Sequence, residues 1–199
     1  MTQRTIEFFW DAASPYTYLA ATQIEALAQR CGCVLQWRPF VLGKAFEATG
    51  NRAPAQIPAK GKYLFKDLRL WAKHYGVPLF FPRVFPVNSL TAGRIGCALP
   101  PEQVGRWAQA VMTAYWTRDA DISQAEVLKG VADAAGFDGA ALLAAAQEQP
   151  AKDLLRANTE EAVERGVFGA PTFFVGEQMF WGNDRLVLLE DYLNGKLAA

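Results

Sequence analysis

A strand, a helix and a second strand follow one another at the start of the chain with almost no loop between them. Thr5 to Asp11 is a short run rich in aromatic residues, which is typical of a strand buried on both faces. Ser14 is a favourable N-cap, Pro15 suits the first helical turn, and Gly32 is placed to end the helix. Val34 to Arg38 then predicts the second strand. Because a single helix connects the two strands, they are expected to be parallel.

Helical periodicity dominates the middle of the chain. Apolar stripes with helical spacing run through residues 64–75 and 104–115. Residues 123–126 match a capping box before a third helix, and the alanine-rich segment after Asp138 predicts a fourth. Residues 40–59, which contain two glycines and two prolines, are expected to form an irregular functional loop that leads into these helices.

The C-terminal part returns to mixed structure. A helix is predicted from about Ala151 to Arg165, and residues 172–181 form a predicted hairpin. Asn183 or Asp184 would cap a final helix over residues 185–192. The whole order is strand–helix–strand, helical insertion, helix–strand–strand–helix, which is that of a thioredoxin-like fold split by a helical subdomain.

The expected fold class is therefore α/β, with a thioredoxin-like domain and a helical insertion. Residues 1–60 and 150–199 are assigned to the thioredoxin-like domain, and residues 61–149 to the inserted helical domain.

The charge balance and hydrophobicity of the chain restrict the classes of partner that it can bind. The chain has 20 basic and 20 acidic residues, a balance that provides no field to gather a nucleic acid backbone, so a small uncharged or mildly anionic ligand is expected instead. Charged residues interrupt every apolar stretch before the roughly 18 residues that would suggest a membrane span. The first residues lack an apolar signal segment. We expect no membrane partner and a cytoplasmic location.

The histidine and cysteine content restricts the chemistry. The single histidine, His74, closes an apolar helical stripe just before Gly76, where a helix end favours a cation, so neither a Ser-His-Asp triad nor a metal site is expected. The three cysteines form no disulfide framework, and their odd number fits a reducing compartment. Cys31 and Cys33 are too close for an unstrained disulfide and are not expected to be redox-active.

Ser14 opens the first candidate site. Taken alone, Ser14 is an N-cap, but this turn follows the first strand, where thioredoxin-like folds hold their Cys-x-x-Cys pair. The four positions here read Ser14-Pro15-Tyr16-Thr17. Without sulfur they cannot exchange disulfides, but the helix N-terminus still stabilises an anion such as a ligand's thiolate.

Two later segments offer binding groups. Pro171 begins a strand after a tight turn; this is either a simple turn or a cis Ala170-Pro171 bond that leaves the N–H and C=O of Ala170 free to pair with an extended peptide. The run from Asn183 to Arg185 either caps a helix or forms the binding site for an amino acid group. In the second case Asp184 pairs with the amino group, and the helix start and Asn183 bind the carboxylate.

The combined motifs resemble a known enzyme family. Their order and spacing are similar to those of the bacterial 2-hydroxychromene-2-carboxylate isomerases and the related kappa-class glutathione transferases, and the resemblance covers nearly the whole chain. It rests on these segments: Ser14-Pro15-Tyr16, Gly50-Asn51, Lys60-Gly61, Val167 to Pro171 and Trp181 to Leu186. The resemblance implies a DsbA-like thioredoxin domain with a helical insertion and glutathione as cofactor.

The resemblance also implies roles for single residues. Ser14 would hydrogen-bond the glutathione sulfur, and Ala170 beside Pro171 would pair with the cysteinyl part. Three further residues, Asn183, Asp184 and Arg185, would lie at the γ-glutamyl group, and Asn51 and Lys60 at the glycyl end. Tyr16 and the stretch Pro86-Val87-Asn88 would lie beside the second substrate, a small aromatic carboxylate, and related proteins make a homodimer the expected state.

Three functions are compatible with these motifs. In a glutathione-dependent cis-trans isomerase of 2-hydroxychromene-2-carboxylate or a similar aromatic-ring-cleavage intermediate, a bound thiolate would add to a conjugated double bond and leave again. In a kappa-class-like transferase the same addition would yield a released thioether and consume glutathione. A non-catalytic thioredoxin-like domain would only bind glutathione or peptides. The isomerase is our leading hypothesis.

Overall fold

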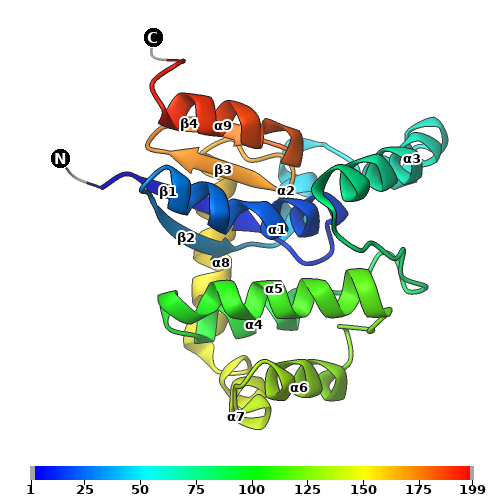
Figure 1. The fold of residues 1–199 in the computed structure, drawn as a ribbon. Helices are drawn as coiled ribbons and strands as arrows, with labels where there is room; N and C mark the ends of the chain where they lie inside the picture. The colour runs from blue at the N-terminus through cyan, green and yellow to red at the C-terminus, as the bar shows by residue number, and fades with distance from the viewer. Residues whose placement is uncertain (1–2, 198–199) are drawn as a thin grey trace.

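The computed structural model describes residues 3–197, which contain a four-stranded sheet with helices on both faces (Figure 1). The sheet order is β2-β1-β3-β4. β1 pairs in parallel with β2 and antiparallel with β3, and β3 pairs antiparallel with β4, so the predicted parallel pair and hairpin are confirmed. The strands are β1 (Thr5–Trp10), β2 (Val34–Pro39), β3 (Thr172–Val175) and β4 (Gln178–Trp181).

Most of the chain between β2 and β3 is helical. Among the described residues, no helix has the length and apolar character needed to cross a membrane. Two turns of 3-10 helix, η1 (Pro54–Gln56) and η2 (Asn183–Arg185), accompany the α-helices. The helices are α1 (Pro15–Arg30), α2 (Leu42–Thr49), α3 (Pro58–Tyr75), α4 (Leu90–Ala98), α5 (Pro101–Arg118), α6 (Ala125–Ala134), α7 (Gly139–Ala145), α8 (Gln149–Glu164) and α9 (Leu186–Leu193).

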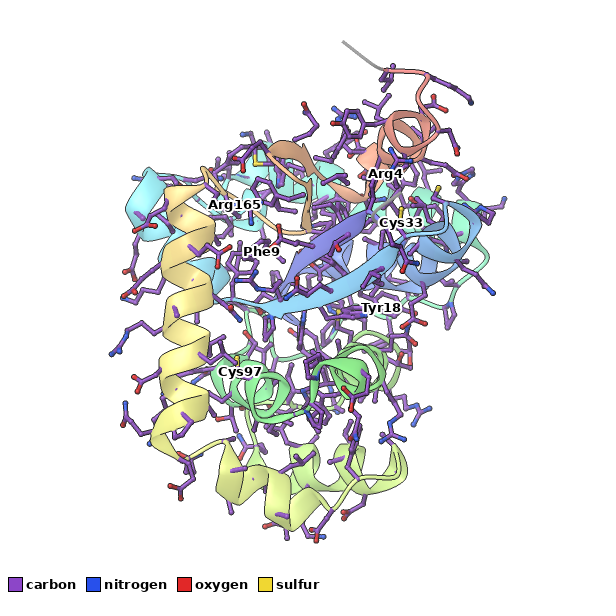
Figure 2. All side chains as sticks on the ribbon, turned by 90° about the vertical axis from the view of Figure 1, so that its left-hand side faces the viewer. Arg4, Phe9, Tyr18, Cys33, Cys97 and Arg165 are labelled. Atoms are coloured by element: carbon purple, nitrogen blue, oxygen red, sulfur yellow. The ribbon has the colours of Figure 1, made fainter. Side chains whose placement is uncertain are left out.

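The two faces of the sheet bury separate clusters. Adjacent strand residues point to opposite faces, so Phe8 packs on Phe173 in the main core, with ring centroids 4.8 Å apart, whereas Phe9 meets Phe174 on the other face. Helices α1 and α9 cover the first face, and α2 and α8 cover the second (Figure 1). On the second face the Arg165 guanidinium lies over the Phe174 ring at 3.8 Å, close to Phe9 (Figure 2).

The helical segment is packed directly on the rest of the molecule. Trp107 and Trp116 of α5 are fully buried in the same core as β1 and α1. The indole Nε1 of Trp116 donates a hydrogen bond of 2.9 Å to the carbonyl of Ala12, in the turn that precedes α1. This contact fixes α5 against the turn that carries Ser14.

Helix α2 corrects the predicted irregular loop over residues 40–59. Its N-cap, Val41, provides no side-chain hydrogen bond, so no capping residue marks the start of the helix in the sequence. The helix forms because Ala45 is fully buried against the cluster that includes Phe9 and Phe40. Tertiary packing therefore outweighs the weak local signal.

Helix α4 was also missed, because Gly93 and Gly96 lower its intrinsic helix propensity. Both glycines lie at close contacts. A Cβ on Gly96 would lie 3.1 Å from Cζ2 of Trp10, and one on Gly93 would lie 3.3 Å from the side chain of Leu155. The glycines allow α4 to approach β1 and α8.

The predicted helix caps were partly wrong. The helix predicted after Asp138 forms as α7, and the Asp138 side chain caps it by accepting a hydrogen bond from the N–H of Ala141. The capping box at residues 123–126 does not form: Gln124 is the N-cap of α6, and the Ser123 hydroxyl donates to Asp121 instead. Asn183 and Asp184 do not cap the final helix either. They lie in η2, and α9 begins after Arg185.

Candidate functional site

Ser14 lies where α1 meets the start of β3. Its side chain is buried, and its Oγ accepts a hydrogen bond from the N–H of Thr17, which confirms the predicted N-cap. The same Oγ donates to the carbonyl of Ala170 at 3.1 Å. The Ala170-Pro171 bond is cis. Ser14 and the residues beside Pro171 thus share one site, although they are 156 positions apart in the chain.

The Ala170 backbone is only half free. The prediction that both its N–H and its C=O are available was wrong for the carbonyl, which accepts from Ser14. Within residues 3–197 the N–H of Ala170 makes no hydrogen bond. The Thr17 hydroxyl, which is fully buried one helical turn from Ser14, also has no partner among the described residues. Sequence reasoning gave Thr17 no role.

The η2 turn is held against the same site by the sheet. Thr172 pairs with Trp181, so the residues just outside the hairpin, Pro171 and Gly182, lie side by side, and the Gly182 N–H donates to the Pro171 carbonyl at 2.9 Å. Gly182 has a φ of 111°, and a Cβ there would lie 2.4 Å from Oδ1 of Asp184. This position therefore requires glycine.

Within η2, Asn183 is buried at 2% exposure, and its carbonyl accepts a hydrogen bond from the Tyr75 hydroxyl of α3 at 3.1 Å. Its side-chain Nδ2 is buried without a partner among the described residues. Asp184 and Arg185 form an ion pair at 2.7 Å on the surface of the turn. The predicted trio therefore lies together beside Pro171, with a free buried amide donor.

Tyr16 lies two residues beyond Ser14, in the first turn of α1, and its side chain reaches α3. Its hydroxyl donates to Oδ2 of Asp67 at 2.6 Å, and the Tyr63 hydroxyl donates to Oδ1 of the same carboxylate at 3.2 Å. Burial, the hydrogen bond to Asp67 and the charge of that carboxylate raise the pKa of Tyr16 above that of a free phenol. Tyr16 is therefore a neutral hydrogen-bond donor, not a base.

Asn51 lies on the segment between α2 and α3, and Lys60 lies at the start of α3. Asn51 donates from Nδ2 to the Phe168 carbonyl at 2.8 Å, which links its loop to the turn before Pro171. Lys60 is exposed in the first turn of α3 and lines a cavity of about 350 Å³ together with Tyr16 and Tyr63. The structure therefore brings Tyr16 and Lys60 together.

Asn88 is exposed at the start of α4, and its Oδ1 accepts from the N–H of Leu90 at 3.0 Å. Its side chain makes no hydrogen bond to the other predicted site residues in the described part of the chain. The neighbouring Ser89 hydroxyl, however, donates to Oδ1 of Asp11 at 2.6 Å, and the carbonyl of Asp11 accepts from the N–H of Ser14. The segment that carries Asn88 is thus linked, through Ser89 and Asp11, to the turn that carries Ser14.

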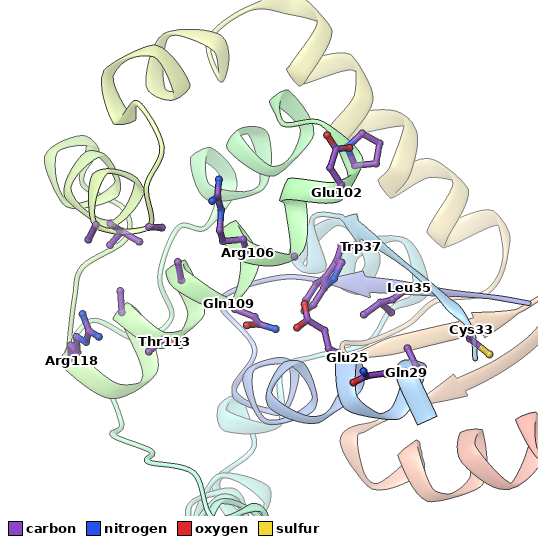
Figure 3. A pocket seen from close by; sticks show the side chains of 18 residues that line it. Glu25, Gln29, Cys33, Leu35, Trp37, Glu102, Arg106, Gln109, Thr113 and Arg118 are labelled. Atoms are coloured by element: carbon purple, nitrogen blue, oxygen red, sulfur yellow. The ribbon is translucent and has the colours of Figure 1, made fainter. Parts of the chain in front are cut away.

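Two features lie outside this site. His74 is exposed at the end of α3 beside Trp71, in agreement with its predicted place at a helix end. A cavity of about 780 Å³ lies between α1, β2 and α5, and Figure 3 shows Glu25, Trp37 and Arg106 among the side chains that line it. None of the predicted site residues lines this cavity.

Known proteins are similar to this chain over nearly its whole length. Residues 5–194 match the family model of the DSBA-like thioredoxin domain. The chain is 36% identical to a 2-hydroxychromene-2-carboxylate isomerase of Sphingobium xenophagum, over 96% of this chain and 98% of the relative. It is 30% identical to human glutathione S-transferase kappa 1, over 97% of this chain and 92% of the relative.

Solved structures give the same answer. A structure of a 2-hydroxychromene-2-carboxylate isomerase superposes with a TM-score of 0.87 at 31% identity, and the match covers 98% of this chain and 100% of that one. The predicted fold class, a DsbA-like thioredoxin fold, and the predicted family are therefore confirmed. The chain belongs to the DSBA-like thioredoxin domain family and, within it, to the enzyme family of the 2-hydroxychromene-2-carboxylate isomerases.

Proposed function

We propose that this chain is a glutathione-dependent cis-trans isomerase that acts on 2-hydroxychromene-2-carboxylate or a similar aromatic-ring-cleavage intermediate. The observation that carries the proposal is the Ser14 hydroxyl at the N-terminus of α1, beside the Ala170-Pro171 turn, in a chain of this family. The site holds a hydroxyl where a redox thioredoxin fold holds a thiol, so it suits a sulfur that arrives with a ligand.

The residues of the site fit the groups of glutathione. The tripeptide carries an ammonium group, two carboxylates, peptide groups and a thiol. The free N–H of Ala170 suits a peptide carbonyl, and the unpartnered Nδ2 of Asn183 suits a carboxylate oxygen, because a buried donor without a partner is costly. The residues that would hold glutathione through charge or hydrogen-bonding groups are Ser14, Asn51, Lys60, Ala170, Asn183, Asp184 and Arg185. Pro171 would contribute by shaping the turn beside Ala170.

When bound, glutathione supplies a thiolate that adds reversibly to a conjugated double bond, so that rotation becomes possible before the bond is restored. A free thiol with a pKa of about 8.5 is only a few per cent ionised at neutral pH. Lowering the pKa of the bound thiol by about two, which is equivalent to about 2.7 kcal/mol, makes the thiolate the main form. The partial positive charge at the start of α1 and a hydrogen bond from the Ser14 hydroxyl both act in that direction.

Ser14 must change partner to do this. Its proton is now directed at the Ala170 carbonyl, and turning it to the sulfur leaves that carbonyl open to a peptide N–H of the tripeptide. We propose that Tyr16, a neutral donor held by Asp67, lies on the substrate side; the cavity that it lines also contains Tyr63 and Lys60. The aromatic part of a small aromatic carboxylate suits the two tyrosine rings, whereas the Lys60 ammonium suits the glycyl carboxylate of glutathione.

The test is a turnover assay of the purified protein with 2-hydroxychromene-2-carboxylate and a catalytic trace of glutathione. We expect many turnovers per glutathione, no accumulation of thioether, and no activity once glutathione is removed. Full activity without glutathione would disprove the cofactor assignment.

The transferase is the second candidate, because human glutathione S-transferase kappa 1 aligns with 97% of this chain. The same assay separates the two functions. Stoichiometric loss of glutathione with a stable thioether product would favour the transferase over the isomerase.

A further inference from the structure

Asp11, at the end of β1, holds three segments of the chain through one carboxylate. It is buried at 6% exposure. Its Oδ1 accepts hydrogen bonds from the N–H of Ala13 at 2.9 Å and from the Ser89 hydroxyl at 2.6 Å. Its Oδ2 accepts from the N–H of Leu42 at 2.9 Å. The three donors belong to the turn before α1, the start of α4 and the start of α2.

Each of these segments carries a residue of the candidate site. Ala13 immediately precedes Ser14, whose own N–H donates to the Asp11 carbonyl at 3.1 Å. Ser89 immediately follows Asn88, the proposed substrate residue. Leu42 begins α2, which ends just before Asn51. The Asp11 carboxylate is therefore the common anchor of the sulfur side and the substrate side of the site.

A contribution to stability does not by itself explain why residue 11 is a buried carboxylate. Burial raises the pKa of Asp11, and its three hydrogen bonds oppose that rise without cancelling it. In the described part of the chain no Lys, Arg or His lies within ion-pair distance of Asp11. A buried charge without a countercharge is costly, so this group is better explained by the positions that it fixes than by the stability that it adds.

We propose that Asp11 is a positioning residue that fixes Ser14 relative to Asn88, so that the bound sulfur and the substrate meet in the geometry of the reaction. This inference rests on the proposed function. Asp11 touches neither ligand; it acts through Ala13, Ser89 and Leu42.

The first test is Asp11→Asn, which keeps the shape of the side chain. One carboxylate oxygen becomes an NH₂ group, so at least one of the three donors faces another donor. We expect kcat to fall about tenfold or more, because small misplacement at a reacting centre is that costly, while the dissociation constant for glutathione changes less than about threefold. The pKa of the bound thiol, measured from the ultraviolet absorbance of the thiolate, should rise as Ser14 loses its position.

The second test is Ser89→Ala, a milder change that keeps the carboxylate and its bonds to Ala13 and Leu42. It removes only the link to the substrate side. We expect KM for the isomerisation substrate to rise about threefold or more, in line with the loss of one hydrogen bond that orders the substrate side, while the pKa of the bound thiol stays that of the wild type. A general loss of structure would not raise KM while leaving the pKa of the bound thiol unchanged.

Asp121→Asn is the matched control. Asp121 also accepts from a serine hydroxyl, that of Ser123 at 2.6 Å, and from a backbone N–H, but it lies before α6 and outside the site. Its kcat and KM should match the wild type. The inference fails if folded Asp11→Asn and Ser89→Ala keep wild-type kcat, KM and thiol pKa. If Asp11→Asn does not fold, Ser89→Ala decides. Failure of the proposed function is separate, since then the wild type itself shows no glutathione-dependent isomerisation.

Discussion

Ser14 combines two roles in one hydroxyl group. As an acceptor it caps α1 through the N–H of Thr17, and as a donor it holds the Ala170 carbonyl. Both bonds lie where a ligand sulfur would meet the positive end of the helix. The structural role is modest in energy, whereas the proposed chemical role is not.

Ser14→Ala should therefore separate the two roles. Loss of an N-cap costs about 1 kcal/mol, so the variant should still unfold cooperatively in a thermal melt. Turnover should fall at least about tenfold, because the hydroxyl that stabilises the thiolate is missing. Wild-type kcat in the folded variant would remove Ser14 from the mechanism.

Only part of the site could be predicted from the sequence. Ser14 and the run from Asn183 to Arg185 stand out because their patterns are local. Asp11 and Asp67 do not, because the side chains that link them to other parts of the site are far away in the chain: Ser89 is 78 positions from Asp11, and Tyr16 is 51 positions from Asp67. A carboxylate of this kind acquires its role only when the fold brings its donors together.

Secondary structure elements show the same division. α1 and the β3–β4 hairpin were predictable, because a cap, a proline and a tight turn mark them locally. α2 and α4 were not, because α2 lacks a capping side chain and α4 contains two glycines. Their stability comes from neighbours such as Phe9 and Trp10, whose positions no local pattern reveals.

A pair of glycine substitutions tests this explanation of α4. Gly96→Ala should destabilise the protein by about 1 kcal/mol, because the new Cβ would lie 3.1 Å from Trp10, which is fully buried and cannot yield. That clash outweighs the gain in helix propensity. Gly130→Ala in α6 has nothing within 4 Å of its Cβ and should stabilise by up to about 1 kcal/mol. Urea unfolding measures both, and equal effects of the two substitutions would contradict the packing argument.

A network of charged side chains ties the sheet to α8. Glu7 of β1 accepts from Arg38 of β2 at 2.8 Å and from Arg165, which follows α8, at 2.9 Å. Glu161 of α8 bonds to the same two arginines. Each carboxylate thus meets two cations, and the network ties two strands to the helix on the face opposite α1.

Glu161→Gln tests how much this network holds the two parts together. Burial raises the pKa of Glu161, but hydrogen bonds and the charges of Arg38 and Arg165 outweigh burial and lower it. A lowered pKa in the folded state means that the network stabilises above the unfolded value of ~4.5 and loses this contribution as the pH falls through the folded pKa. At neutral pH the substitution should cost about 1 kcal/mol, since this carboxylate is 41% exposed.

The two stability curves should therefore converge as the pH falls below ~4.5, because wild-type Glu161 then becomes neutral like the glutamine. Glu160→Gln is the control, since its carboxylate is 65% exposed and lies 3.9 Å from Arg156 in a surface pair worth little. Chemical unfolding of the three proteins between acidic and neutral pH gives the comparison. Parallel curves for wild type and Glu161→Gln would show that the link between the sheet and α8 depends on packing around Phe9 and Phe174, and not on charge.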